Sequence, residues 1–377
     1  MANTKKNTNI HCPMIHNGLF LSMASDPKLA NISSCCLRPP EKINYEVSNS
    51  LWDDPFFIPL IEKNKKNEWD PDCANCKSLE EVGHVSFRQG MLTAWGQEER
   101  LSGPKRIDFT FSSSCNIACR ICGPTASTYW AKHQKENKID FPVVQKNKTG
   151  QEAIEMLKKF DLSNLISLTF CGGETLLGND YWEVCEYLAT LPHAKESLMI
   201  SFQTNGTQPI PKKRYDLLDK FHLIKLHVSL DGVEERFNYQ RWPADWKQVE
   251  ENLFNIKENA PGNVMFLIEE TLSIFNLAYY GEVAKWRKQY FNTNREGDLV
   301  DHTHHIAQGT YHHRGCTQEY VDFLRTTKES NIISADWEED PVLIKKMIAE
   351  IKQYDQFRNQ SFKESLPKVA EFYKRYL

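Results

Sequence analysis

Short apolar runs alternate with longer amphipathic stretches between residues 105 and 307. The runs have the length of buried strands, and the stretches between them repeat apolar residues at helical spacing. We expect strands at residues 106–112, 167–170, 198–203, 224–230, 264–274 and 299–307. We expect helices at residues 126–137, 150–160, 180–190, 212–220, 245–259 and 278–289. Six strands that alternate with helices predict an α/β fold, in which a parallel sheet carries helices on its outer face.

The first hundred residues have little regular apolar pattern of their own. Short strands are expected at residues 18–25 and 32–37, a helix at about 54–66 and a second helical stretch at 77–95. We predict that residues 1–100 form a small domain, which depends on its cysteines for stability.

The end of the chain, residues 317–377, contains two or three amphipathic helices, including residues 342–354 and 363–376. Their simplest role is to cover the open side or the bottom of the sheet. The alternating strands and helices between the two ends, residues 101–316, form the predicted central domain.

Composition limits the possible settings and partners. The net charge of -4 gives no general basic field, so a nucleic-acid substrate is not favoured. No apolar run approaches the roughly 18 residues that cross a bilayer, and the amino terminus lacks the apolar core of a secretory signal. We therefore expect a cytoplasmic protein that does not enter a membrane, and a monomer.

The chain contains eleven cysteines, and in the cytosol thiols favour metal ligation over disulfides. Cys115, Cys119 and Cys122 have C-x3-C-x2-C spacing. Three thiolates are too few for an ordinary four-ligand iron-sulfur site, so a cluster that they held would leave one iron open. A structural zinc knuckle and three ordinary buried thiols are the alternatives.

A second group of cysteines precedes residue 100. Cys12, Cys73 and Cys76, with either Cys35 or Cys36, make four thiolates, enough for one closed zinc site or one fully ligated iron-sulfur cluster. Their spacing does not choose between the two metals. Because adjacent thiols point differently, one of Cys35 and Cys36 is a spare, and we place Cys36 in the ligand set.

Polar motifs follow the predicted strands, and in parallel sheets chemistry gathers at the carboxyl ends of the strands. Glycines let backbone approach a ligand, an acid accepts from an ammonium group, and arginine suits a carboxylate. An ordinary turn or polar contact is the alternative for each motif. The candidate ligand-binding residues are Gly172, Gly173, Glu174, Asn205, Ser229, Arg241 and Asn276.

The last predicted strand carries Asp301-His302-Thr303-His304-His305. On a strand His302 and His304 share one face, and we take them as candidate catalytic residues. Substrate binding or proton transfer, a mononuclear metal site and a hydrogen-bonded polar layer are the three interpretations of this segment.

These motifs, from about Arg106 to His305, resemble the radical S-adenosylmethionine (radical SAM) superfamily. The resemblance implies a partial, TIM-like (β/α)6 barrel in which Cys115, Cys119 and Cys122 hold a 4Fe-4S cluster. It implies that S-adenosylmethionine chelates the open iron and is cleaved to a 5'-deoxyadenosyl radical, which abstracts a hydrogen atom from substrate. Glu174 would contact the cofactor's amino group, Ser229 its ribose, Arg241 its carboxylate and Asn276 its adenine.

The upstream cysteines resemble the SPASM and twitch domains, which carry an auxiliary 4Fe-4S cluster in many radical SAM enzymes. The resemblance implies that Cys12, Cys36, Cys73 and Cys76 hold such a cluster, although here the segment precedes the barrel. The expected reaction is oxidation or cross-linking of a peptide, a protein side chain or a small molecule, with a reductant such as flavodoxin or ferredoxin. A nucleotide or nucleic-acid substrate is one alternative, and a noncatalytic iron-sulfur or zinc protein for electron transfer or as a scaffold is another.

Overall fold

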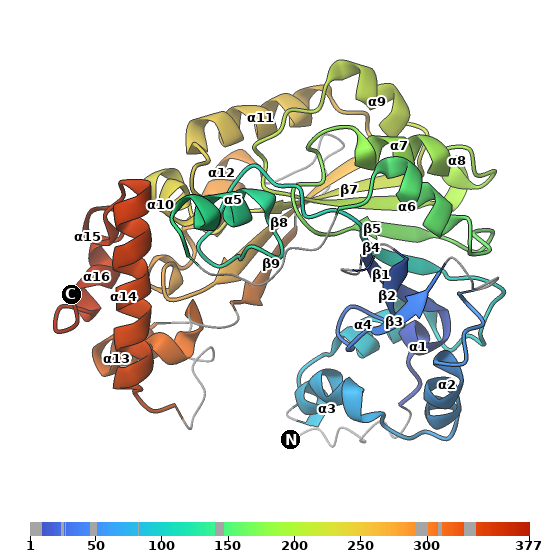
Figure 1. The fold of residues 1–377 in the computed structure, drawn as a ribbon, viewed down its shortest axis with the longest axis horizontal. Helices are drawn as coiled ribbons and strands as arrows, with labels where there is room; N and C mark the ends of the chain where they lie inside the picture. Colours follow the sequence, from blue (N-terminus) through green and yellow to red (C-terminus); the bar gives the residue numbers. More distant parts are fainter. Residues whose placement is uncertain are drawn as a thin grey trace.

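The computed structural model describes residues 10–23, 26, 28–45, 51–81, 83–139, 147–291, 301–307, 311–327 and 337–377, without the side chains of residues 23, 301, 302, 304, 306 and 313. One sheet of nine strands runs through it in the order β3-β2-β1-β4-β5-β6-β7-β8-β9. Helices α6, α7, α9 and α11 lie over one face of the sheet, whereas the helices before residue 100 and the C-terminal helices lie towards its two ends (Figure 1).

Six strands of this sheet are parallel to their neighbours and form the expected partial barrel. They are β4 (Arg106–Thr110), β5 (Ser167–Phe170), β6 (Met199–Thr204), β7 (Leu223–Ser229), β8 (Val264–Leu272) and β9 (Asp301–Ile306). Each falls within a predicted strand or differs from it by one residue at an end, which confirms the predicted (β/α)6 arrangement. The prediction for residues 299 and 300 lies outside the described residues.

Side chains along these strands alternate between two environments. On β7, Leu226 and Val228 are buried beneath the helices, whereas His227 and Ser229 are only partly buried on the inner face of the sheet. β8 repeats this alternation over its whole length. The inner face therefore carries the polar side chains, as a barrel with its chemistry inside requires.

The helices between the strands begin and end near their predicted limits. They are α5 (Thr128–Glu136), α6 (Gly150–Leu157), α7 (Asp180–Leu188), α9 (Lys212–Leu218), α11 (Trp246–Asn259) and α12 (Glu282–Tyr290). Side-chain caps explain several starts; the Asp245 carboxylate, for example, accepts from the Gln248 amide at the start of α11. Two further short helices, α8 (Ala194–Ser197) and α10 (Glu234–Gln240), were not predicted.

The segment before residue 100 extends the same sheet. β1 (Gly18–Met23) pairs in parallel with β4, and β2 (Leu29–Ser33) and β3 (Glu41–Asn44) continue it as antiparallel strands. Leu19, Leu21 and Ile32 belong to the same apolar core as the barrel strands. The division at residue 100 stays a prediction, but the sheet is continuous across it.

Two predictions in this segment were wrong. The strand expected at 32–37 ends at Ser33, and residues 34–37 form a turn. The helical stretch expected at 77–95 is two helices, α3 (Ala74–Glu81) and α4 (Phe87–Trp95), because Ser86 and Gln89 form a capping box that starts a new helix. The remaining helices there are α1 (Pro13–Asn17), α2 (Phe57–Lys65) and the 3-10 turn η1 (Pro71–Cys73).

The C-terminal helices are α13 (Gln318–Arg325), α14 (Pro341–Arg358), α15 (Phe362–Ser365) and α16 (Pro367–Phe372). The single helix expected at 363–376 is wrong, because Pro367 begins a new helix. These helices share a second apolar core with Tyr239 of α10 and Phe275 after β8, so they cover one side of the barrel (Figure 1). Within the described ranges, no helix has the length and apolar character that crossing a membrane requires.

Candidate functional site

The three cysteines of the C-x3-C-x2-C motif lie in the loop after β4, at the carboxyl edge of the sheet. Cys115, Cys119 and Cys122 line a cavity of about 270 Å³. The sequence-predicted residues that line the same cavity are Gly172, Gly173, Asn205, Ser229 and Arg241. Motifs separated by more than a hundred residues thus meet in one site, which we call the cysteine-loop cavity.

The electrostatics of this cavity are dominated by one buried arginine. Arg241 Nη2 lies 2.8 Å from Asp231 Oδ2, and Nη1 lies 3.8 Å from Cys119 Sγ. Burial raises the pKa of the Cys115 thiol to about 11 and also raises the pKa of Cys119 and Cys122. Since such thiols do not ionise unaided at neutral pH, this donor set suits a metal cluster that brings its own positive charge.

The glycine pair allows two loops to pack closely. Gly172 and Gly173 have positive φ angles of 86° and 43°. A Cβ atom on Gly173 would lie 2.2 Å from the Ser114 carbonyl oxygen, and the next amide, Glu174 N, donates to that oxygen at 2.8 Å. Both glycines are therefore required for the contact with the cysteine loop, besides lining the cavity.

Glu174 is completely buried and does not line the cavity. Its Oε1 accepts from Thr204 Oγ1 at 2.7 Å, and its Oε2 accepts from the Asn205 amide at 2.6 Å. Burial raises the pKa of this carboxyl, against the effect of those hydrogen bonds. Asn205 Nδ2 in turn lies 3.2 Å from Asn116 Oδ1 and 3.8 Å from Cys115 Sγ. Glu174 thus fixes the turn that presents Asn205 to the cysteine loop.

Asn276 is also placed away from the cavity lining. Its Nδ2 donates to the carbonyl oxygens of Thr271 at 3.0 Å and Asp231 at 3.2 Å, and its Oδ1 accepts from the Ser273 amide at 2.8 Å. Asn276 therefore ties together the loops after β7 and β8. In this position it supports Asp231, which is the counter-ion of Arg241. Asp231 was not among the residues predicted from the sequence.

Arg120, within the cysteine loop, connects this loop to the C-terminal helices, and its side chain is fully buried. Arg120 Nη2 donates to Asp355 Oδ1 of α14 at 2.5 Å and to Gln360 Oε1 at 3.0 Å, and its Nε donates to the Tyr239 carbonyl at 3.1 Å. The backbone amide of Arg120 also donates to the Gln240 carbonyl at 2.7 Å. The C-terminal helices are therefore fastened to the loop that carries the thiols.

A carboxylate between two imidazoles lies on the inner face of the barrel. Glu269 Oε1 lies 2.6 Å from His227 Nδ1, and Glu269 Oε2 lies 3.9 Å from His305 Nε2. Burial alone would raise the pKa of Glu269, but the two imidazoles hold it at about 2, and Glu269 raises the pKa of His305. His227 is two residues before Ser229 on β7, and alternate residues of a strand point to the same face. His227 therefore lies on the inner face, as Ser229 does.

His302 and His304, the predicted catalytic residues, pair with Ile268 and Glu270 of β8 in the sheet register. Their side chains lie outside the described residues, so their roles stay predictions. His227 and Glu269 were missed because neither belongs to a motif.

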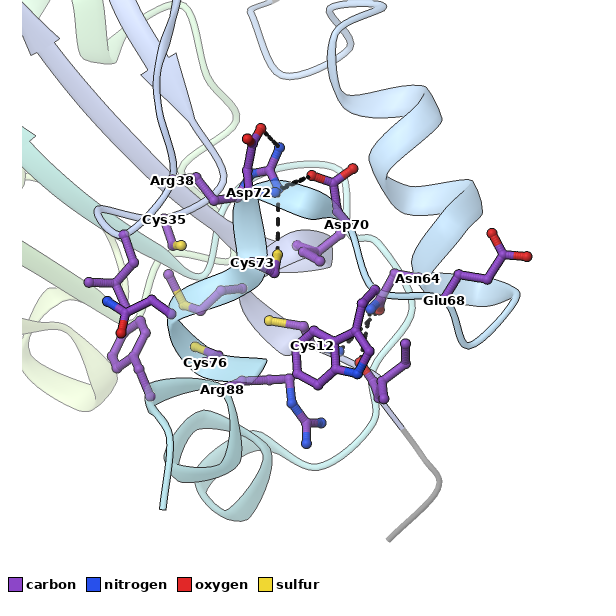
Figure 2. Close-up of a pocket in the computed structure, with 17 residues that line it drawn as sticks. Cys12, Cys35, Arg38, Asn64, Glu68, Asp70, Asp72, Cys73, Cys76 and Arg88 are labelled. Atoms are coloured by element: carbon purple, nitrogen blue, oxygen red, sulfur yellow. Dashed lines mark hydrogen bonds and ion pairs between the residues drawn. The ribbon is translucent and has the colours of Figure 1, made fainter. Parts of the chain in front are cut away.

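Four thiols meet at a second cavity, in the segment before residue 100. Cys12, Cys35, Cys73 and Cys76 line it, together with Arg38 and several apolar side chains (Figure 2). We call it the four-thiol cavity. Burial raises the pKa of Cys12 and of Cys35 to about 12.

The structure places Cys35 at this cavity, whereas the sequence analysis had placed Cys36 there. Cys36 is exposed, and its thiol lies beside the carboxylate of Asp108 on β4. The two neighbours point in different directions because they stand in the turn after β2, which no periodicity in the sequence marks.

We predict that Asp355→Asn destabilises the protein by about 3 kcal/mol, because it leaves the buried Arg120 guanidinium without its counter-ion. Chemical denaturation measures this change, and hydrogen exchange should speed up at residues 115–122. Lys158→Gln is the matched control, since its ion pair with Glu155 is about half exposed and contributes little. An equal effect of the two substitutions would contradict the role assigned to Arg120.

We also predict a pH dependence that comes from Glu269. Its pKa of about 2 in the folded protein is below the ordinary 4.5, so its contribution to stability is complete above pH 4.5 and is lost as the pH falls towards 2. Glu269→Gln should remove this part of the pH–stability curve and lower the pKa of His305, measured by NMR titration. Glu251→Gln, at an exposed position on α11, should do neither.

Comparisons with known proteins agree with the chemistry of the cysteine-loop cavity. Residues 109–275 match the family model described as "Radical SAM superfamily". No curated protein sequence matches the chain.

Two solved structures are among those to which this chain is similar. Native anSMEcpe with bound AdoMet has a TM-score of 0.41 and 19% sequence identity, over 67% of this chain and 62% of that one. Streptococcus suis SuiB bound to S-adenosylmethionine has a TM-score of 0.40 and 12% identity, over 90% of this chain and 69% of that one. The match thus spans less than two thirds of anSMEcpe. The similarity to the radical SAM superfamily therefore extends over residues 109–275, less than half of the chain.

Proposed function

We propose that this protein is a radical SAM enzyme that cleaves S-adenosylmethionine reductively and abstracts a hydrogen atom from a substrate. The observation that carries the proposal is the cysteine-loop cavity, where three thiols face Arg241, Asn205 and Ser229, with no fourth cysteine among the described residues that line it. When bound there, a 4Fe-4S cluster supplies an electron and S-adenosylmethionine supplies the 5'-deoxyadenosyl radical.

The side chains around the three cysteines suit the polar groups of S-adenosylmethionine. Arg241 presents a planar cation at the cavity wall, and Asp231 fixes its orientation, so it suits a carboxylate. Ser229 and Asn205 offer hydrogen-bonding groups to the ribose and the amino-acid part of the cofactor. Ile117 and Ile121, which also line the cavity, exclude water from the thiols.

The four-thiol cavity is proposed to hold an auxiliary 4Fe-4S cluster, with Cys12, Cys35, Cys73 and Cys76 as ligands. Four thiols complete the ligand set of one 4Fe-4S cluster, and they would equally complete that of a structural zinc site, which is the alternative. The resemblance of the upstream cysteines to the SPASM and twitch domains supports the cluster.

The substrate is proposed to be a peptide, a protein side chain or a small molecule, which is oxidised or cross-linked; a nucleotide is the alternative. His227 supports an oxidation, because Glu269 binds its Nδ1 and thereby leaves Nε2 as a proton acceptor on the inner face. Ser229 lines the cysteine-loop cavity and is the register partner of Glu269, so the acceptor lies next to that cavity. A flavodoxin or ferredoxin would deliver the electron.

A noncatalytic iron-sulfur or zinc protein is the alternative from another class. It predicts bound metal without cleavage of S-adenosylmethionine. The buried Asp231–Arg241 pair at the cavity favours the enzyme, because a scaffold has no need for a buried cation beside its cluster.

The first experiment is anaerobic reconstitution with iron and sulfide, followed by dithionite and S-adenosylmethionine. We expect 5'-deoxyadenosine from the wild-type chain and only background from Cys119→Ala. Cys185→Ala, which removes a buried thiol of α7, should retain activity. A wild-type protein with its full iron content that forms no 5'-deoxyadenosine would contradict the enzyme proposal.

The iron content tests the second cluster and its ligands. We expect about eight irons per chain in the wild type, four for each cluster, and about four in Cys35→Ala. Cys36→Ala is the matched control and should keep all the iron, since Cys36 does not line the four-thiol cavity. If Cys36→Ala rather than Cys35→Ala loses iron, the assignment is reversed; zinc in place of iron would rule out the auxiliary cluster.

A further inference from the structure

Arg38 lies at the wall of the four-thiol cavity, beside one of its sulfurs. Its Nη1 donates to Cys73 Sγ at 3.5 Å. The same nitrogen donates to Asp70 Oδ1 at 2.7 Å, and Nη2 donates to Asp72 Oδ2 at 3.2 Å. Figure 2 shows these three contacts, all made by the guanidinium of Arg38. Only 5% of the Arg38 side chain is exposed, so this cation is buried at the cavity wall.

The partners of Arg38 also build the turn that delivers Cys73. Asp70 is the N-cap of η1, where its side chain accepts from the Asp72 amide, and Cys73 is the last residue of that turn. Lys63 Nζ lies 3.1 Å from the other oxygen of Asp70. The guanidinium is thus fixed relative to the sulfur by carboxylates on the same short element.

Two cations and two anions lie around this contact. Arg38 and Lys63 are cations, and Asp70 and Asp72 are anions, so their sum is zero. A simple net charge therefore does not explain why a guanidinium is buried there. What distinguishes Arg38 from Lys63 is the hydrogen bond to sulfur.

The rest of the wall makes that hydrogen bond effective. Met14, Ile15 and Phe87 line the cavity and keep it apolar. Hydrogen bonds and charges act more strongly in such surroundings than in water. Hydrogen bonds to cluster sulfurs are among the factors that set the reduction potential of an iron-sulfur cluster.

We propose that Arg38 is a positioning residue that raises the reduction potential of the cluster at the four-thiol cavity, through its hydrogen bond to Cys73 Sγ. This inference rests on the auxiliary cluster of the proposed function. Reduction places additional negative charge on the cluster and its thiolates, and a donor at the sulfur stabilises the reduced form more than the oxidised form. Arg38 thus prepares this cluster to accept an electron.

The test uses the full-length chain with Cys115, Cys119 and Cys122 replaced by alanine, so that only the four-thiol cavity can hold a cluster. Iron content and the midpoint potential, followed by EPR in a redox titration, are measured in this background and with Arg38→Gln added. We expect Arg38→Gln to lower the reduced-to-oxidised ratio at fixed potential about tenfold, a shift of about 59 mV to more negative potential for a one-electron couple.

Lys63→Gln is the matched control. It removes the positive charge of Lys63, which is also paired with Asp70, and leaves the hydrogen bond from Arg38 to Cys73 in place. We expect a much smaller shift than in Arg38→Gln. Equal shifts would show that plain charge accounts for the effect and would overturn the proposal.

The remaining outcomes separate this proposal from the proposed function. A background protein with about four irons and an unchanged potential in Arg38→Gln overturns the role of Arg38 alone. A background protein without iron overturns the auxiliary cluster and this inference with it. If Arg38→Gln does not retain iron, Arg38→Lys replaces it. That variant should shift the potential in the same direction by less, and an unchanged potential there overturns the proposal.

Discussion

The buried guanidinium of Arg120 is the interaction on which the candidate site depends most. It stands between two cysteines of the motif, and its partners come from α10, from α14 and from the turn after α14. Burying a cation is unfavourable unless it is paired with an anion, here Asp355 of α14, so the loop keeps this conformation only while the C-terminal helices are in place. The C-terminal segment is therefore part of the support of the thiols.

The same principle operates at the cavity itself. Arg241 and Asp231 pair beside Cys119, while Glu174 and Asn276 hold the loops that present Asn205 and Asp231. Glu174 and Asn276 both form hydrogen bonds to the loops that line the cavity, and their predicted contacts with the cofactor stay predictions. A motif identifies where a site lies but does not separate its lining from its supports.

The central sheet was predictable because its strands and helices have clear periodicity and because the cysteine and glycine motifs fall at strand ends. The pairing of the amino-terminal strands was less predictable. β1 was predicted as a strand, but nothing in its sequence indicates pairing with β4. The turn after β2 determines that Cys35 rather than Cys36 lines the four-thiol cavity, and Arg120 pairs with a residue more than two hundred positions away. Such contacts depend on tertiary packing, which local sequence patterns do not encode.

The continuity of the sheet from β3 to β9 has a mechanical consequence. The four-thiol cavity is attached to β1 and β2, and the cysteine-loop cavity is attached to β4, the direct neighbour of β1. Strands joined by ladder hydrogen bonds and a shared core do not turn about a hinge as two linked domains can. The sheet therefore holds the two cavities at a constant separation, and the two clusters proposed for them would exchange electrons without the movement of a domain.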